Sequence, residues 1–305
     1  AGLKDPYSTY YTAEQYKELN TSNEGSYVGI GAVLQKDNDG GATVVQLYEG
    51  GPGEQAGLKT GDVIKAIDGT DVTEKETSDI ASMVRDSEKD SVTLTIQREN
   101  EEKTQDIKVE IRDVEIKTVS HEMLSGDTGY IRISEFSEVT SDQYKKAFAD
   151  LKSQGMKKLV VDLRDNPGGL LNTVCDILRQ ILPEGLIVYT EDKNGKREEE
   201  TCDGKNELDI PLAVLVNGNS ASASEIFAGA VKDYGIGTIV GTTTYGKGVV
   251  QTIQPLTDGS AVKITIAKYF TPKGNDINKK GITPDVEAEL SGDITDWAEL
   301  THEED

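Results

Sequence analysis

The feature that most constrains the fold is a regular alternation of apolar runs with helical patterns in the second half of the chain. Apolar runs at 158–162 and 212–216 each lead through a short turn into a helical pattern, at 170–182 and 222–234. Strands that alternate with helices through short connections build a layered α/β domain. We therefore predict an α/β domain over residues 114–290.

A different pattern precedes this domain. In residues 27–113 the apolar runs are short and end at Gly, Asp or Asn, which is typical of a small β-rich module. Only two helical patterns interrupt it, and the longer one covers residues 77–86. The whole chain is thus expected to be α+β, with a small β-rich domain inserted ahead of the α/β domain.

The two ends of the chain form separate segments. Thr12 and Gln15 have the spacing of a capping box, so residues 1–26 are predicted to be a helical segment that packs on the α/β domain. Residues 291–305 are rich in acidic side chains and are predicted to form a solvated tail.

The charge balance narrows the classes of partner. The chain has 305 residues, with 32 Lys and Arg against 55 Asp and Glu, a net charge of −23. A field of this sign repels phosphates and anionic lipids, which argues against nucleic-acid binding. No apolar run approaches the roughly 20 residues that cross a bilayer. Because the sequence starts at Ala1 without a leader, we expect a processed or truncated piece, with a membrane anchor upstream left open.

Cysteine and histidine are scarce. Cys175 and Cys202 are too few for a disulfide-dense scaffold or a cysteine-only zinc site. We predict two buried free thiols, with a single disulfide as the alternative. Of the two histidines, we place His302 in the solvated tail and interpret His121 as a polar linker residue. A hydrolase of this composition is expected to use a base other than histidine.

Three glycine-containing segments of the β-rich module carry a specific pattern, at 27–31, 50–58 and 61–69. The Gly-Ile-Gly turn of the first can present successive N–H groups to a carboxylate ahead of a strand edge. Alone, each glycine would indicate an ordinary turn; in this order the segments resemble a PDZ domain, in the circularly permuted form found in bacterial proteases. The resemblance implies a peptide groove formed by Gly29, Ile30, Gly31, Ile80, Met83 and Val84.

The first motif of the α/β domain is Asp-Leu-Arg-Asp-Asn-Pro-Gly-Gly at 162–169, between a strand and a helix. Gly168 and Gly169 let the backbone turn sharply and expose N–H groups at a helix N-terminus. Such a turn suits a developing oxyanion. A plain strand–helix joint is the alternative interpretation.

The second motif places three serines, Ser220, Ser222 and Ser224, alternately with alanine where a strand runs into a helix. Small residues leave room for a substrate backbone, and a helix N-terminus stabilises negative charge. Simple N-capping explains one serine but not the whole pattern. The motif is not a G-x-S-x-G elbow, which disfavours an α/β-hydrolase.

The third motif is Tyr-Gly-Lys-Gly, with Lys247 between two glycines ahead of an apolar strand. A desolvated lysine there would have a lowered pKa and could act as a general base, although a surface lysine is the alternative. Gln251 lies four residues further on, and on a strand this even spacing puts both side chains on one face. Gln251 could then accept a hydrogen bond from the amine and orient it.

Together these motifs resemble the C-terminal processing proteases, also called tail-specific proteases, which are S41-type serine peptidases with a Ser–Lys dyad. The resemblance covers most of the chain and implies a crotonase/ClpP-like spiral core. The implied site consists of the nucleophile Ser222, the base Lys247, the assisting Gln251 and an oxyanion hole from Gly168 or Gly169 with Ala223. One departure from the family pattern is the charged Asp165.

The function expected from this resemblance is a serine endopeptidase that recognises the C-terminal ends of proteins through its PDZ domain. It would need no metal or cofactor and would act outside the cytoplasm, membrane-anchored in the full-length protein. A homodimer stays open, because relatives often dimerise through a further helix. Arg85, at the end of the groove helix, is the candidate that couples peptide binding to the catalytic core. The alternative is a peptide-binding scaffold with an inactive protease core; a nucleotide-binding enzyme is disfavoured, since no sound phosphate loop is present.

Overall fold

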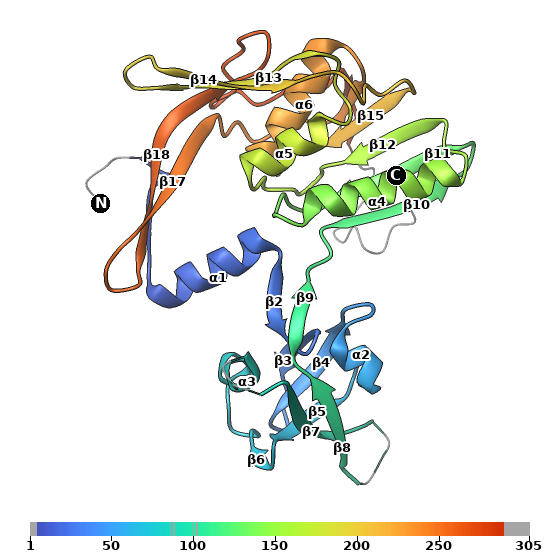
Figure 1. Ribbon diagram of the computed structural model, residues 1–305, viewed down its shortest axis with the longest axis vertical. Coiled ribbons are helices and arrows are strands. Elements are labelled where there is room, and N and C mark those ends of the chain that lie inside the picture. The colour runs from blue at the N-terminus through green and yellow to red at the C-terminus, as the bar shows by residue number, and fades with distance from the viewer. Residues whose placement is uncertain (1–4, 86, 88, 100, 102, 290–305) are drawn as a thin grey trace. The chain divides into compact units, whose positions relative to one another are not determined.

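The protein is described by a computed structural model. It covers residues 5–85, 87, 89–99, 101 and 103–289. The chain divides into two compact units (Figure 1). Residues 26–117 form the small unit, and the segments before and after them form the large unit. The division lies within a few residues of the expected limits 27 and 113, while the expected tail at 291–305 lies outside the described residues. In the described part, no helix is long and apolar enough to cross a membrane.

A β-sheet forms the centre of the small unit. Its strands follow the order β3-β4-β5-β7-β8, with antiparallel neighbours and β6 beside β5. In β7, Val92, Leu94 and Ile96 are buried and alternate with polar residues, as the two-residue period of a half-buried strand requires. The bounds are β3 (Ala32–Lys36), β4 (Ala42–Leu47), β5 (Val63–Ile67), β6 (Thr70–Asp71), β7 (Ser91–Gln97) and β8 (Gln105–Glu110).

Two helices and a two-stranded ribbon complete the small unit. They are α2 (Pro52–Ala56), α3 (Thr77–Arg85), and β2 (Ser26–Gly29) paired antiparallel with β9 (Arg112–Glu115). In α3, Ile80 and Val84 are one helical turn apart and are both buried in the core of this unit.

The main sheet of the large unit has the order β10-β11-β12-β15-β16-β19. All neighbours from β11 onwards are parallel, and β10 is antiparallel at the edge. The helices α4, α5 and α6 connect the strands, so the predicted α/β architecture is confirmed. The bounds are β10 (Val119–Leu124), β11 (Thr128–Ile133), α4 (Thr140–Ser153), β12 (Lys158–Asp162), α5 (Leu171–Leu178), β15 (Leu212–Val216), α6 (Ala223–Tyr234), β16 (Thr238–Gly241) and β19 (Val286–Glu287).

A second sheet of the large unit pairs β1, near the start of the chain, with β18, about 250 residues further on. Its order is β1-β18-β13-β14, with β17 beside β18 as a long hairpin (Figure 1). The helix α1 (Ala13–Glu24) follows β1 and begins with the predicted capping box of Thr12 and Gln15. The strand bounds are β1 (Thr9–Tyr11), β13 (Gly185–Asp192), β14 (Arg197–Cys202), β17 (Val249–Pro255) and β18 (Ala261–Phe270).

Two minor expectations meet different outcomes. Cys175 and Cys202 are both free and buried, as predicted, and burial raises the pKa of the Cys175 thiol to about 12. His121 is not a linker residue: it lies in the edge strand β10, where its Nε2 is 2.9 Å from an Asp150 carboxylate oxygen. The sequence of β10, Val-Ser-His-Glu-Met-Leu, does not alternate between apolar and polar residues, so periodicity does not mark it as a strand.

Candidate active site

Three connections that contain the sequence motifs meet at one edge of the main sheet. They follow β12, β15 and β16, which are adjacent and parallel, so their carboxyl ends lie side by side. The Ala221 N–H donates to the Asn166 carbonyl at 3.0 Å, and the Tyr245 N–H donates to the Ser220 carbonyl at 3.0 Å. Such an edge is where open α/β sheets place their ligands. The structure thus brings the three predicted motifs into one site.

Ser222 has a strained backbone at the start of α6. Its φ is +55° and its ψ is −111°, a combination rarely adopted outside glycine, which costs about 1–3 kcal/mol. The two flanking serines have structural partners: the buried Ser220 hydroxyl donates to the Leu163 carbonyl at 2.8 Å, and the buried Ser224 hydroxyl donates to the Asn166 carbonyl at 3.0 Å. The alternating serines therefore divide into two that fasten the neighbouring turn and a central one held in a strained conformation.

The carboxylate of Glu225 ties this serine to the lysine motif. Glu225 is fully buried, and its Oε2 accepts hydrogen bonds from the N–H groups of Ser222 and Lys247, both at 2.9 Å. Its Oε1 accepts from the Gly246 N–H at 2.7 Å and the Thr244 hydroxyl at 2.6 Å. Because one oxygen accepts from both residues, the backbone nitrogens of Ser222 and Lys247 lie within about 6 Å of each other.

Tyr269 of β18 holds the same two residues from their carbonyl side. Its buried hydroxyl donates to the Ser222 carbonyl at 3.0 Å and also contacts the Lys247 carbonyl. Burial raises the pKa of Tyr269 well above its ordinary value, so the phenol remains a donor. Neither Glu225 nor Tyr269 is among the site residues predicted from the sequence. The three-residue spacing from Ser222 to Glu225, typical of a capping box, was the one available signal.

Lys247 is half-buried beside this arrangement. Burial lowers the pKa of its amine, the nearby Lys263 ammonium lowers it further, and the Glu225 carboxylate opposes both effects. Within the described residues, the amine has no hydrogen-bond acceptor and lies 5.6 Å from the centre of the Tyr7 ring. The depressed basicity has the direction that a general base requires. A hydrogen bond from the amine to Ser222 is not among the described contacts, so the dyad itself stays a prediction.

The placement of Gln251 differs from the expectation. Lys247 lies before β17, which begins at Val249, and the register of β17 shifts between Val250 and Gln251. The prediction that both side chains share one face of a strand is therefore wrong, because the two residues do not belong to one regular strand. The Gln251 side-chain amide donates to the Tyr7 carbonyl instead, and no contact with the Lys247 amine occurs in the part of the chain that the structure describes.

The Asn-Pro-Gly-Gly turn lies directly against the serine. A Cβ added to Gly168, whose φ is +106°, would come 2.7 Å from the Ala221 carbonyl oxygen and 2.8 Å from the Ser222 Cβ. The Gly168 N–H donates to the Asn166 side chain at 2.8 Å and is thus occupied. The N–H groups of Gly169 and Ala223 have no protein acceptor among the described residues. Of the three predicted oxyanion-hole residues, these two retain an available donor.

We expect Gly168→Ala to lower cleavage by about a hundredfold, because the added methyl group would displace the turn from Ser222. The positive φ and the close contacts should also destabilise the fold by about 2 kcal/mol or more. Gly235→Ala is the matched control, since Gly235 also has a positive φ but no atom within 4 Å of the added Cβ. Thermal unfolding and cleavage rates of both variants test this; an equal loss of activity in both would show that only the backbone conformation matters.

A buried ion pair fixes the start of the same turn. Asp162 is fully buried and accepts from the Arg164 guanidinium at 2.8 Å and from the Tyr130 hydroxyl at 2.6 Å. The unexpected charge at Asp165 also has partners, because its Oδ1 accepts from the side-chain amides of Asn217 at 3.0 Å and Asn219 at 2.7 Å. Asp165 therefore links the Asn-Pro-Gly-Gly turn to the loop that carries the serines.

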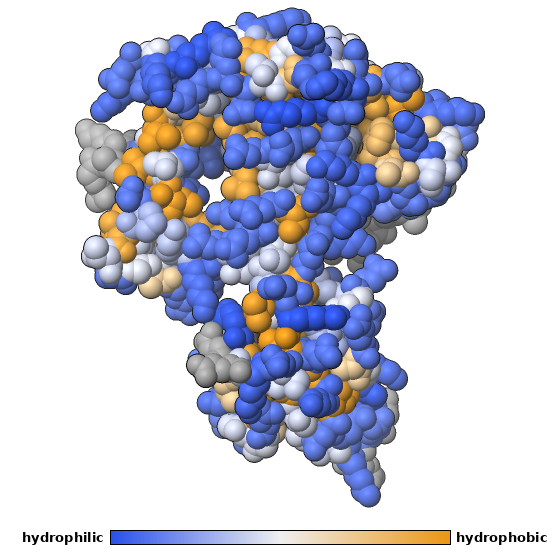
Figure 2. Space-filling model, in the orientation of Figure 1, coloured by the Kyte–Doolittle hydropathy of each residue, from blue (hydrophilic) through white to orange (hydrophobic). Residues whose placement is uncertain are grey.

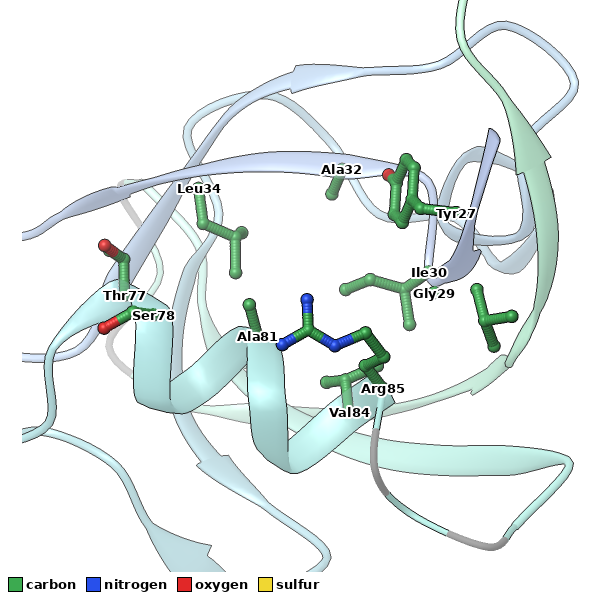
Figure 3. A pocket seen from close by; sticks show the side chains of 11 residues that line it. Tyr27, Gly29, Ile30, Ala32, Leu34, Thr77, Ser78, Ala81, Val84 and Arg85 are labelled. Carbon is green, nitrogen blue, oxygen red and sulfur yellow. The ribbon is translucent and has the colours of Figure 1, made fainter. Parts of the chain in front are cut away.

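The small unit has its own candidate site, a hollow of about 320 Å³ between α3 and the strands β2 and β3. Figure 2 shows hydrophobic residues, in orange, among the hydrophilic ones on the visible face of the small unit. The Arg85 side chain reaches into the hollow from the end of α3, while Thr77 and Ser78 lie at the other end of the helix (Figure 3). Its apolar lining consists of Val28, Ile30, Ala32, Leu34, Ala81 and Val84.

Three of the six residues predicted to form the groove do not line this hollow. Ile80 is fully buried in the core of the small unit, and Met83 packs against that core, so neither lines the hollow. From α3, Ala81, Val84 and Arg85 line the hollow instead. Gly29 and Ile30 line the hollow as expected, whereas Gly31, with φ +70°, turns the chain beside Pro52.

The large unit thus combines an α/β fold with a strained serine close to a half-buried lysine, and the small unit carries an apolar hollow beside a helix. The sequence profile of peptidase family S41 matches residues 127–288, and that of the PDZ domain matches residues 43–98. The chain belongs to peptidase family S41 and carries a PDZ domain. The expected family is confirmed.

The relatives agree with this assignment. The chain is 41% identical over 288 residues to the "Probable CtpA-like serine protease" of Staphylococcus aureus (strain N315), and 39% identical over 287 residues to that of Staphylococcus epidermidis. The matches cover 93% of this chain but only 57% and 58% of those relatives, so the chain spans little more than half their length. A solved structure, the photosystem II D1 C-terminal processing protease, is 34% identical with a TM-score of 0.57, covering 94% of this chain and 79% of that one.

Proposed function

We propose that this chain is a serine endopeptidase in which Ser222 is the nucleophile and Lys247 the general base. The observation that carries the proposal is the shared Glu225 oxygen, which holds the backbones of the strained serine and of the half-buried lysine side by side. Family membership supports the reaction class. The lowered pKa of Lys247 supports its role as the base.

In the proposed reaction, the neutral Lys247 amine takes the proton of the Ser222 hydroxyl as its oxygen attacks the scissile carbonyl carbon. The N–H groups of Ala223 and Gly169 stabilise the oxyanion of the tetrahedral intermediate. The protonated Lys247 then donates its proton to the leaving amine, and a water molecule hydrolyses the acyl-enzyme. Activity should rise with pH, because only the neutral amine can accept the proton.

The proposed substrates are polypeptides with accessible C-terminal ends, recognised by the PDZ hollow and cleaved outside the cytoplasm. The apolar lining suits an apolar C-terminal side chain. The Gly29–Ile30 loop and the Arg85 guanidinium supply a polar end that can receive a carboxylate. Arg85 donates to the Ser82 hydroxyl at 3.1 Å, and its role in coupling the two units remains part of the proposal.

A peptide that ends in an apolar residue with a free carboxylate should bind about tenfold more tightly than its C-terminally amidated twin. The reason is that the amide cannot form charge-assisted hydrogen bonds, each worth about 1.5–3 kcal/mol. Calorimetric titration of the Ser222→Ala protein measures both affinities. Equal affinities would remove carboxylate recognition from the proposal.

Two variants locate the binding site. Ala81→Glu puts a negative charge into the hollow and should abolish peptide binding, whereas Gln46→Glu adds the same charge at an exposed β4 position outside the lining. The same peptides, used together with a cleavage assay, distinguish the proposed peptidase from the alternative, a peptide-binding scaffold with an inactive core. A scaffold with an inactive core would bind the free carboxylate but leave an unstructured protein substrate uncleaved at every pH.

A further inference from the structure

The N-terminal segment of the large unit lies against Lys247, although it is about 240 residues away in the sequence. The Tyr7 ring centre is 5.6 Å from the Lys247 amine nitrogen, and the Tyr7 carbonyl accepts the hydrogen bond from the Gln251 side chain. The Asp5 carboxylate accepts from the Tyr7 N–H at 3.2 Å and from the Ser8 hydroxyl at 2.5 Å. The ring is therefore held in place by its own backbone contacts.

The following residues fasten this segment to the second sheet. β1 pairs antiparallel with β18, with Thr9 opposite Lys263. The Thr265 N–H also donates to the Ser8 hydroxyl at 3.4 Å. Tyr7 thus lies two residues before a paired strand, and the pairing of β1 with β18 anchors the backbone that carries its ring.

We propose that Tyr7 is a positioning residue of this peptidase, whose ring covers the Lys247 amine and limits its hydration so that the amine can be neutral when Ser222 is activated. This inference rests on the proposed Ser–Lys function. It also gives Gln251 a different role from the one expected: Gln251 acts on Lys247 through the backbone of Tyr7.

The ring has two opposing effects on the lysine. An aromatic face attracts an ammonium by about 0.5–1 kcal/mol at exposed sites, which favours the charged form. Covering the amine removes water, which favours the neutral form. The charged and titratable groups around the amine are the Lys263 ammonium of β18, the Glu225 carboxylate of α6 and the phenols of Tyr7 and Tyr269.

The net effect of the Tyr7 ring on the pKa of Lys247 follows from the larger of these two contributions, which is the removal of water. Burial is the main reason why the pKa of Lys247 lies below its ordinary value, and Lys263 adds to the shift while Glu225 opposes it. Removing the ring should therefore raise the pKa of the lysine, since hydration outweighs the lost attraction. At any pH below that pKa, a smaller fraction of the amine is then neutral.

The first test is the dependence of kcat/KM on pH for Tyr7→Ala, Tyr7→Phe and the parent. Tyr7→Ala should move the acidic limb to higher pH, with about fivefold lower kcat/KM on that limb and recovery towards the parent at high pH. Tyr7→Phe keeps the ring and should retain the parent profile. Tyr10→Ala is the matched control, because it removes the same ring from an exposed position in the same segment.

The second test measures the protonation of Lys247 in a variant that lacks the proposed nucleophile. In the Ser222→Ala background, the pH dependence of Lys247 labelling by an acylating reagent is measured by mass spectrometry, with the exposed Lys193 as reference. We expect the midpoint to move to higher pH in Tyr7→Ala only. An unmoved midpoint, or an equal shift in Tyr10→Ala, would overturn the role of Tyr7. If the parent cleaves nothing at any pH, the peptidase proposal fails, while the labelling midpoint still decides whether Tyr7 controls the amine.

Discussion

Ser222→Ala and Lys247→Ala should each lower kcat/KM for cleavage of an unstructured protein by about ten-thousandfold or more. Ser222→Ala removes the atom that attacks the carbonyl, and Lys247→Ala removes the group that accepts the proton. Neither substitution removes a side chain of the hydrophobic core, so both variants should fold. Initial rates from product quantification by mass spectrometry measure the loss.

The double variant gives a sharper version of this test. Because the two groups act as one unit, Ser222→Ala combined with Lys247→Ala should be no slower than either single variant. His121→Ala is the control for a different base; its ring lies in β10 and contacts Asp150, so activity should stay near that of the parent. A folded His121→Ala protein without activity would contradict the assignment of Lys247.

Glu225→Gln should have the second largest effect. The carboxylate accepts four hydrogen bonds, and in glutamine one oxygen becomes an NH₂ group that faces two N–H or O–H donors. Two buried donors without acceptors cost about 2–4 kcal/mol in the free energy of unfolding. We also expect cleavage to fall by about a hundredfold, because the backbones of Ser222 and Lys247 lose their common anchor.

Denaturant unfolding and kcat/KM, measured at a temperature where the variant remains folded, separate the two effects of Glu225→Gln. Glu287→Gln at an exposed position of β19 removes the same charge and should change neither quantity. A Glu225→Gln protein that is less stable but as active as the parent would show that the carboxylate supports the fold alone.

The three motifs of the site were predictable because they are local. Each lies in the connection after a parallel strand, and apolar runs identify such strands in the sequence. Adjacent parallel strands end at the same edge of a sheet, so the meeting of the Asn-Pro-Gly-Gly turn, the serines and Lys247 follows from the architecture. The strained conformation of Ser222 is not visible in the sequence, because a serine does not signal a positive φ as a glycine at that position would.

The contacts of Gln251 and Tyr7 could not be predicted, because they depend on pairing between distant segments of the chain. The shift of register between Val250 and Gln251 depends on pairing with β18, and no local signal marks it. Tyr7 reaches Lys247 because β1 pairs with β18, a contact across more than 250 residues. Hydrophobic periodicity likewise located the groove helix but favoured Ile80 and Met83, which pack in or against the core, over the smaller Ala81 that faces the hollow.

The most direct test of the central claim is the site at which a serine-directed phosphonate attaches covalently. Intact mass and peptide mapping of the treated parent protein should show a single adduct on Ser222, formed faster as pH rises and formed at least a hundredfold more slowly in Lys247→Ala. Ser222→Ala should remain unmodified. An adduct on another residue, or an inhibited protein without any adduct on Ser222, would contradict the assignment of Ser222 as the nucleophile.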